Sequence, residues 1–157
     1  MKALLQKVKS AYVVINNEVY GEINTGYVIF FCVEKGDYED LEYKTKLKWI
    51  VDKILNLRLF EENNPDNENY GKMTNSLQDI KGDMLIISQF TLAADVSRGR
   101  KPDFTKAEKP DYAKLIYNEF IDLISSDILG KVATGIFGAD MDVSLINNGP
   151  YTILVEK

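Results

Sequence analysis

Asp83-Met84-Leu85-Ile86-Ile87-Ser88-Gln89-Phe90 places four consecutive apolar residues between an acid and a polar end. A short, continuous apolar run predicts a strand that is buried on both faces, as in sheets covered by helices. Ser88, Gln89 and the nearby Thr91 must then either hydrogen-bond within a neighbouring turn or face a cavity. This segment therefore predicts both the centre of the fold and a candidate site.

Segments on either side of this strand have equally regular patterns. Tyr27 to Val33 is another continuous apolar run and predicts a central strand. Two helices are predicted by apolar residues at i, i+3, i+4 and i+7, the first capped by Asp37 or Asp40 and the second opening at Pro110. The two stripes consist of Leu47, Ile50, Val51, Ile54 and Leu55, and of Ala113, Ile116, Tyr117, Phe120, Ile121 and Ile124.

Strands are also predicted near both ends of the chain, and the intervening polar segments are expected to be loops. The further strands are Lys2 to Lys9, Ala11 to Ile15, Lys131 to Phe137, Met141 to Ile146 and Tyr151 to Val155. Leu57 to Phe60 is an ambiguous segment that could form a short edge strand. The resulting order β-β-β-α-β-α-β-β-β predicts an α/β fold, a mixed β-sheet with two covering helices in a single domain of residues 1–157.

Composition restricts the class of protein. The 157 residues are 45% hydrophobic and 27% charged, which is ordinary for a globular chain. No apolar run approaches the ~20 residues of a membrane helix, and the charged N-terminal segment does not resemble a secretory signal. We therefore expect a cytoplasmic protein without a membrane partner. The single cysteine, Cys32, lies inside an apolar run and is expected to be buried.

Charge is unevenly distributed along the chain. The net charge is −5, which argues against a broad nucleic-acid-coating surface and against DNA as a partner. Residues 98–109 nevertheless carry Arg98, Arg100, Lys101, Lys106 and Lys109. This basic segment could grip one end of a nucleic acid, or it could be an ordinary solvated loop.

The chain contains no histidine, and this absence limits its chemistry. Without histidine, and with one buried cysteine, only an all-oxygen metal site could form. Asp140 and Asp142 alternate along a predicted strand and lack the rest of a calcium loop, so they are expected to be exposed acids. We expect no metal and no cofactor, and no Ser-His or Cys-His catalysis.

Asn147-Asn148-Gly149-Pro150-Tyr151-Thr152 is the second unusual segment. A tight hairpin turn between two strands is the simpler interpretation. A cis Gly149-Pro150 bond, in contrast, could turn two carbonyl oxygens to one side and hold an ammonium group. Because glycine has no side chain, a ligand could approach it very closely.

Taken together, these motifs resemble those of the D-aminoacyl-tRNA deacylase family, of the D-tyrosyl-tRNA deacylase type. The most specific are Ser-Gln-Phe-Thr at 88–91 and Asn-x-Gly-Pro-x-Thr at 147–152. The resemblance runs almost from end to end and includes residues 1–8, 55–60, 88–92, 99–104, 134–141 and 147–152. Lys7 departs from it, since the family has an arginine there that braces the Gly-Pro segment; lysine keeps the charge but not the planar fork.

The resemblance implies a homodimeric hydrolase with a barrel-like mixed sheet. It implies cleavage of the ester between a D-amino acid, or glycine, and the 3′-terminal adenosine of tRNA. Gly149-Pro150 would be cis and would complete the partner's pocket beside Ser88, Gln89, Phe90 and Thr91, excluding L-aminoacyl-tRNA. Phe137 and Met141 are the expected pocket walls, although both could instead be core residues.

This family mechanism would need no histidine. Backbone N–H groups near Phe90 and Thr91 could stabilise the oxyanion, each donor contributing about 2.7–4 kcal/mol in known cases. The ribose 2′-hydroxyl of the substrate would help to activate water. Two other functions stay open. One is a non-catalytic homodimer that binds an aminoacyl or nucleotide end. The other is an esterase with Thr91 or Ser88 as nucleophile, although no partner base for Thr91 is evident.

Overall fold

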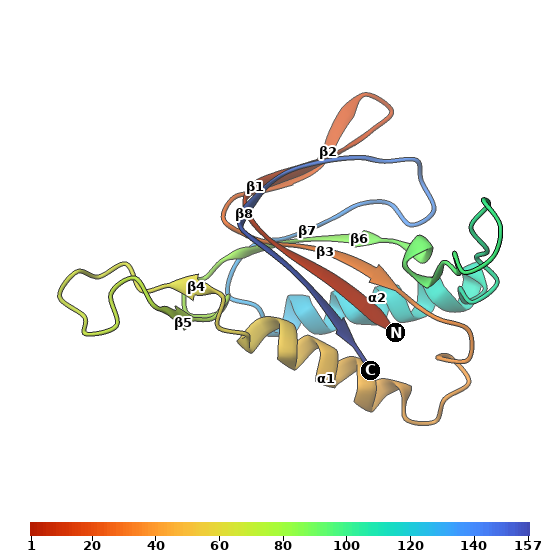
Figure 1. The fold of residues 1–157 in the computed structure, drawn as a ribbon, viewed down its shortest axis with the longest axis horizontal. Coiled ribbons are helices and arrows are strands. Elements are labelled where there is room, and N and C mark those ends of the chain that lie inside the picture. The colour runs from red at the N-terminus through yellow and green to blue at the C-terminus, as the bar shows by residue number, and fades with distance from the viewer.

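The computed structural model describes all 157 residues and has helices on one face of a strongly curved sheet (Figure 1). No helix in it is long and apolar enough to cross a membrane. The elements are β1 (Lys2–Ile15), β2 (Glu18–Ile23), β3 (Gly26–Cys32), α1 (Tyr43–Asn56), β4 (Phe60–Glu61), β5 (Met73–Asn75), β6 (Asp83–Ser88), η1 (Phe90–Ala93), α2 (Pro110–Asp127), β7 (Val132–Thr134) and β8 (Asp142–Glu156).

The main sheet is mixed and nearly closes on itself. Its order is β2-β1-β3-β6-β7, and β8 pairs with the other edge of β1. Strand β3 is antiparallel to β1 and parallel to β6, so Phe31 lies beside Ser88 at one end. A Cβ at Gly21 of β2 would lie 2.9 Å from the Thr134 carbonyl of β7, so the two outer strands approach closely. The predicted mixed, barrel-like α/β fold is confirmed.

Two apolar clusters fill the two sides of the sheet. The larger one lies between the sheet and the helices and includes Phe31 and Phe120, whose rings stack with centroids 4.2 Å apart. The smaller one lies inside the barrel and includes Val13, Leu85 and Ile87. Strand β6 contributes to both clusters, which explains why its sequence is apolar without alternation.

Several predicted elements differ in extent. The two predicted N-terminal strands are one continuous strand, β1, and β2 was missed because four of its six residues are exposed and its pattern is weak. The last two predicted strands are also one strand, so the hairpin interpretation of residues 147–150 is wrong. Neither proposed aspartate caps α1. Asp40 accepts from the Glu42 N–H (2.8 Å) and pairs with Lys46, whereas Asp37 pairs with the Met1 α-ammonium.

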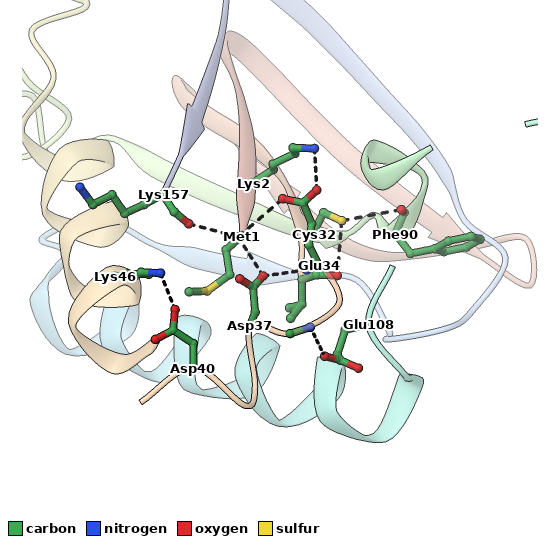
Figure 2. Close-up of polar contacts among 12 residues, drawn as sticks. Met1, Lys2, Cys32, Glu34, Asp37, Asp40, Lys46, Phe90, Glu108 and Lys157 are labelled. Atoms are coloured by element: carbon green, nitrogen blue, oxygen red, sulfur yellow. Dashed lines mark hydrogen bonds and ion pairs between the residues drawn. The ribbon is translucent and has the colours of Figure 1, made fainter. Parts of the chain in front are cut away.

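A polar cluster joins the start of β1 to the segments after β3 (Figure 2). The Met1 α-ammonium lies 2.8 Å from Asp37, and Lys2 pairs with Glu34 at 2.7 Å. The backbone N–H of Gly36 donates to Glu108, just before α2, at 3.0 Å. These contacts hold the ends of β3 and α2 together, and the candidate pocket lies beside them.

Candidate functional site

A pocket of about 500 Å³ opens where β6 ends. Ser88, Gln89 and Phe90 line it, while Thr91 does not. The remaining lining is mostly apolar and comes from β3, the start of α2 and residues 137–143. The buried strand therefore delivers its polar end to a cavity, which is one of the two arrangements expected from the sequence.

The chain turns sharply after Ser88 and is held there by main-chain contacts. The Gln89 N–H donates to the Phe31 carbonyl at 2.8 Å, which continues the β3–β6 pairing by one residue. Residues 90–93 then form the short 3-10 helix η1. The first N–H groups of such a helix have no partner within it, so those of Phe90 and Thr91 can bond only to groups outside η1.

Side chains around this turn fix its shape. The Gln89 side-chain amide donates to the Thr91 hydroxyl. The Cys32 thiol lies 3.7 Å from the Phe90 carbonyl (Figure 2). Burial raises the pKa of Cys32 to about 11, so the thiol stays protonated at neutral pH. Cys32 therefore supports the turn and is not a nucleophile.

Phe137 and Met141, the two predicted wall residues, are among those that line the pocket. Phe137 packs against Tyr117 of α2, with ring centroids 5.7 Å apart. A side chain at Gly135 would overlap the Met141 sulfur, so Gly135 allows Met141 to lie flat against the wall. Both predicted wall residues therefore contact the pocket and the core at once.

The ionisable groups at this pocket are few, and most are already bonded. Glu108 accepts from the backbone N–H groups of Gly36 and Lys109 at 3.0 and 2.7 Å. The Tyr117 hydroxyl donates to the Ile86 carbonyl at 3.0 Å, and burial raises its pKa far above the ordinary range. Asp140 lies at the exposed rim. The pocket thus offers main-chain and neutral polar groups near Ser88, and no side chain poised as a base beside them.

Gly149 and Pro150 form an exposed bulge in β8, and the peptide bond between them is cis. Regular pairing with β1 is interrupted between Gln6–Thr152 and Val8–Asn147, opposite Lys7. The Asn147 side-chain amide closes the base of the bulge by donating to the carbonyls of Lys7 (3.1 Å) and Tyr151 (3.0 Å). Gly149 has a φ of +123°, a region that favours glycine.

Lys7 lies beneath this bulge between two aromatic rings. Its Nζ is 5.3 Å from the Tyr151 centroid and 5.0 Å from the Phe60 centroid, and the residue is only 6% exposed. Burial lowers the pKa of Lys7. A side chain at Gly149 would overlap the Tyr151 ring, so the ring packs directly against the glycine. The predicted link between residue 7 and the Gly-Pro segment thus runs through Tyr151.

One protomer does not bring the two halves of the predicted site together. None of residues 147–152 lines the pocket at Ser88. Strand β8 reaches the pocket only near its start, through Val143, and Gly149 lies six residues further along the strand, about 20 Å at the usual rise per residue. The exposed bulge and the open pocket are therefore separate features of the same chain.

Sequence reasoning missed the supporting residues of the bulge. In the sequence Asn147 is only one residue of a motif, and Phe60 is only the end of an ambiguous segment. The two asparagines that precede Gly149-Pro150-Tyr151 are the signal that could have revealed Asn147, because a bulged backbone needs a donor for its carbonyls.

Comparison with known proteins agrees with the motifs and the fold. Residues 4–156 match the family model described as D-Tyr-tRNA(Tyr) deacylase. D-aminoacyl-tRNA deacylases of Natranaerobius thermophilus and Aquifex aeolicus are 44% and 46% identical over 157 residues, all of this chain and 97% and 98% of theirs.

Solved structures are similar over almost the whole chain as well. The c-Myc DNA Unwinding Element Binding Protein superposes with a TM-score of 0.85 at 34% identity, over 100% of this chain and 99% of that one. A probable eukaryotic D-amino acid tRNA deacylase superposes with a TM-score of 0.76 at 18% identity, over 98% and 97%, which shows a shared fold. Since the family model and relatives above 40% identity cover the chain, it belongs to the D-aminoacyl-tRNA deacylase family.

Proposed function

We propose that this chain hydrolyses the ester that joins a D-amino acid to the 3′-terminal adenosine of tRNA, releasing D-amino acid and tRNA. Family membership supports this activity. The observation that carries it is the character of the pocket, where a polar turn at the end of β6 meets apolar walls without a histidine base. An aminoacyl ester is already activated, so main-chain donors can suffice for its hydrolysis.

The chemistry assigned to the turn is stabilisation of negative charge. Water adds to the ester carbonyl, and the N–H groups of Phe90 and Thr91 donate to the oxyanion. The bond to the ribose oxygen then breaks, and this oxygen takes up a proton. Each well-placed donor contributes about 2.7–4 kcal/mol in comparable sites. Ser88 and Gln89 shape the turn, and the neighbouring ribose hydroxyl of the substrate helps to activate the water.

Selection for the D enantiomer is assigned to Gly149 and Pro150 of a second protomer. Their carbonyl oxygens hold the α-ammonium, so an L side chain would collide with main chain. A D side chain points into the space beside Phe137 and Met141. Glycine has no side chain to exclude, so glycyl-tRNA is a further substrate of this site.

A homodimer is part of this proposal because one protomer contains an open pocket and a distant bulge. Exposed apolar residues lie on the same two strands as the bulge: Tyr12, Ile146 and Leu154 are 44%, 57% and 48% exposed. A second copy could cover them and insert its Gly149 and Pro150 into the pocket. The substrate, aminoacyl-tRNA, and the free thiol of Cys32 both suit the cytoplasm.

The proposal is tested by incubating the protein with D-Tyr-tRNA and L-Tyr-tRNA at equal concentrations and following release of the labelled amino acid. We expect cleavage of the D ester, and loss of the L ester no faster than in buffer alone. Equal rates on both substrates, or no release from either, would contradict the proposal. Tight binding of a D-aminoacyl-adenosine mimic without turnover would instead favour the binding-module alternative.

A further inference from the structure

Two phenylalanines form an exposed aromatic step at the edge of the pocket. The Phe90 and Phe104 rings meet edge to face, with centroids 5.1 Å apart and an interplanar angle of 73°. They are 56% and 38% exposed, and they are the only two of the seven phenylalanines that are exposed. Phe90 lines the pocket, whereas Phe104 does not, so the step leads out of the pocket onto the surface.

The step is flanked by a loop, residues 95–103, whose ends are held together. Asp95 and Asp103 exchange two backbone hydrogen bonds of 2.7 and 3.0 Å. The Asp95 carboxylate accepts from the Ser97 N–H at 2.9 Å and pairs with Lys106 at 3.0 Å. The Asp103 carboxylate accepts from the Thr105 N–H at 2.8 Å. Both carboxylates are thus occupied by groups in or next to the loop. The pKa of each is lowered, chiefly by hydrogen bonds from Ser97 for Asp95 and from Thr105 for Asp103.

The tip of this loop carries unbalanced positive charge. Between Asp95 and Asp103 it contains Arg98, Arg100 and Lys101 and no acid. All three side chains are exposed, and none forms an ion pair or a side-chain hydrogen bond. On a chain with a net charge of −5, such a concentration of free cations favours a polyanionic ligand.

Exposed aromatic rings beside free cations have the two properties that single-stranded nucleic acid requires: faces on which bases stack and charges that meet phosphates. We propose that Phe104, together with Phe90 and the cations at 98–101, binds the unpaired nucleotides that precede the terminal adenosine of the tRNA. This inference rests on the proposed function, because the strand must leave the pocket that holds its aminoacylated end. Phe90 lines that pocket, its ring meets Phe104, and Phe104 directly follows Asp103 at the base of the loop.

The proposal is tested by comparing two substrates, D-Tyr-tRNA and the D-tyrosyl ester of adenosine, which lacks the preceding nucleotides. For Phe104→Ala we expect kcat/KM on D-Tyr-tRNA to fall about 10-fold, mainly through KM, as for loss of one stacked base. On the adenosine ester we expect less than a twofold change. Phe104→Tyr keeps a ring and should restore most of the loss, while Tyr70→Ala, an exposed aromatic in the segment between β4 and β5, is the matched control.

The cations are tested through salt. We plot log kcat/KM for D-Tyr-tRNA against the logarithm of the salt concentration. Replacing Arg98, Arg100 and Lys101 with glutamine should make the slope of this plot less negative, by up to about 0.7 per cation removed. Arg58→Gln removes an exposed cation elsewhere and should leave the slope unchanged. Equal losses of Phe104→Ala on both substrates, or no loss on either, would overturn the assignment.

A binding measurement separates this inference from the proposed hydrolysis. An RNA oligonucleotide ending in adenosine, titrated by fluorescence anisotropy, should bind the wild type more tightly than Phe104→Ala or the triple glutamine variant. If the wild type cleaves neither ester, the hydrolase proposal fails, and the oligonucleotide alone decides about the surface. If the wild type and the variants bind the oligonucleotide with equal affinity, the proposed nucleotide-binding role of this surface is excluded. The same result is expected if the ligand of the surface is an acidic protein instead.

Discussion

Thr91 illustrates how far a single residue can be judged from its surroundings. The hydroxyl lies outside the pocket lining, and its only side-chain partner is the Gln89 amide, which donates to it. A nucleophilic hydroxyl needs a neighbouring group that accepts its proton, and none is present here. The structure therefore supports a positioning role for Thr91 in the turn and disfavours the threonine-esterase alternative.

We predict that Thr91→Val keeps kcat on D-Tyr-tRNA within about fivefold of the wild type, because only one neutral hydrogen bond, worth about 1 kcal/mol, is lost. Thr91→Ser is the control that keeps the hydroxyl. Single-turnover kinetics and mass spectrometry of the quenched protein provide the measurement. The nucleophile hypothesis would be restored if Thr91→Val, but not Thr91→Ser, lost several orders of magnitude of activity and an acyl-enzyme were trapped in the wild type.

Tyr117 carries a prediction about pH. Burial raises its pKa above the ordinary 10.0, so the folded state keeps this proton when the unfolded chain has lost it. The folded state then binds more protons above pH 10, and the free energy of unfolding must fall as pH rises beyond that value. Tyr27, also buried, contributes in the same direction.

Tyr117→Phe should lower the free energy of unfolding at pH 7 by about 1 kcal/mol for the lost hydrogen bond, since the Ile86 carbonyl keeps a bond from the Gly135 N–H. Its stability should decline less steeply than that of the wild type above pH 10. Urea unfolding at pH 7 and at pH 11 measures both effects. Tyr70→Phe, at an exposed tyrosine, should show neither; identical slopes in wild type and Tyr117→Phe would refute the assignment.

At the scale of elements, what sequence could predict depended on local pattern. Strands β3 and β6 and both helices follow from continuous or periodic apolar residues, because these are buried by neighbouring elements. Strand β2 has one buried residue in six, so its pattern is weak. Strand β8 passes through a Gly-Pro segment, which ordinarily ends a strand, and only the bulge supported by Asn147, Lys7 and Tyr151 allows it to continue.

Asn147→Asp tests that support with almost no change in volume. The carboxylate cannot donate to the carbonyls of Lys7 and Tyr151, so the base of the bulge loses both hydrogen bonds. We expect kcat/KM on D-Tyr-tRNA to fall at least 10-fold, and the ratio of D to L cleavage to fall with it, since the carbonyls of Gly149 and Pro150 are no longer held. Asn16→Asp, at an exposed asparagine in the turn between β1 and β2, is the control. An unchanged D-to-L ratio in a folded Asn147→Asp protein would argue against this role.

At the scale of the whole molecule, the sequence motifs contain both halves of the proposed site but do not place them relative to each other. Ser88 to Thr91 and Gly149-Pro150 are 58 residues apart at their nearest, and the sheet order then separates them by two strands. Motif content is a property of the chain, whereas the site proposed above would be completed only when two chains assemble. No local pattern encodes that assembly, so it must be tested directly.

Mixed dimers provide this test. Phe137→Arg obstructs the pocket but leaves Gly149-Pro150 intact. Gly149→Ala leaves the pocket intact but disturbs the bulge, because the added side chain would overlap Tyr151. Each variant alone should be inactive on D-Tyr-tRNA. If Gly149 and Pro150 act across a two-fold interface, a heterodimer purified through two affinity tags regains one complete site and about half of the wild-type activity. If they act within their own protomer, the heterodimer has no complete site and stays inactive, and this result would contradict the shared site. A protein that is monomeric in light scattering would contradict it as well.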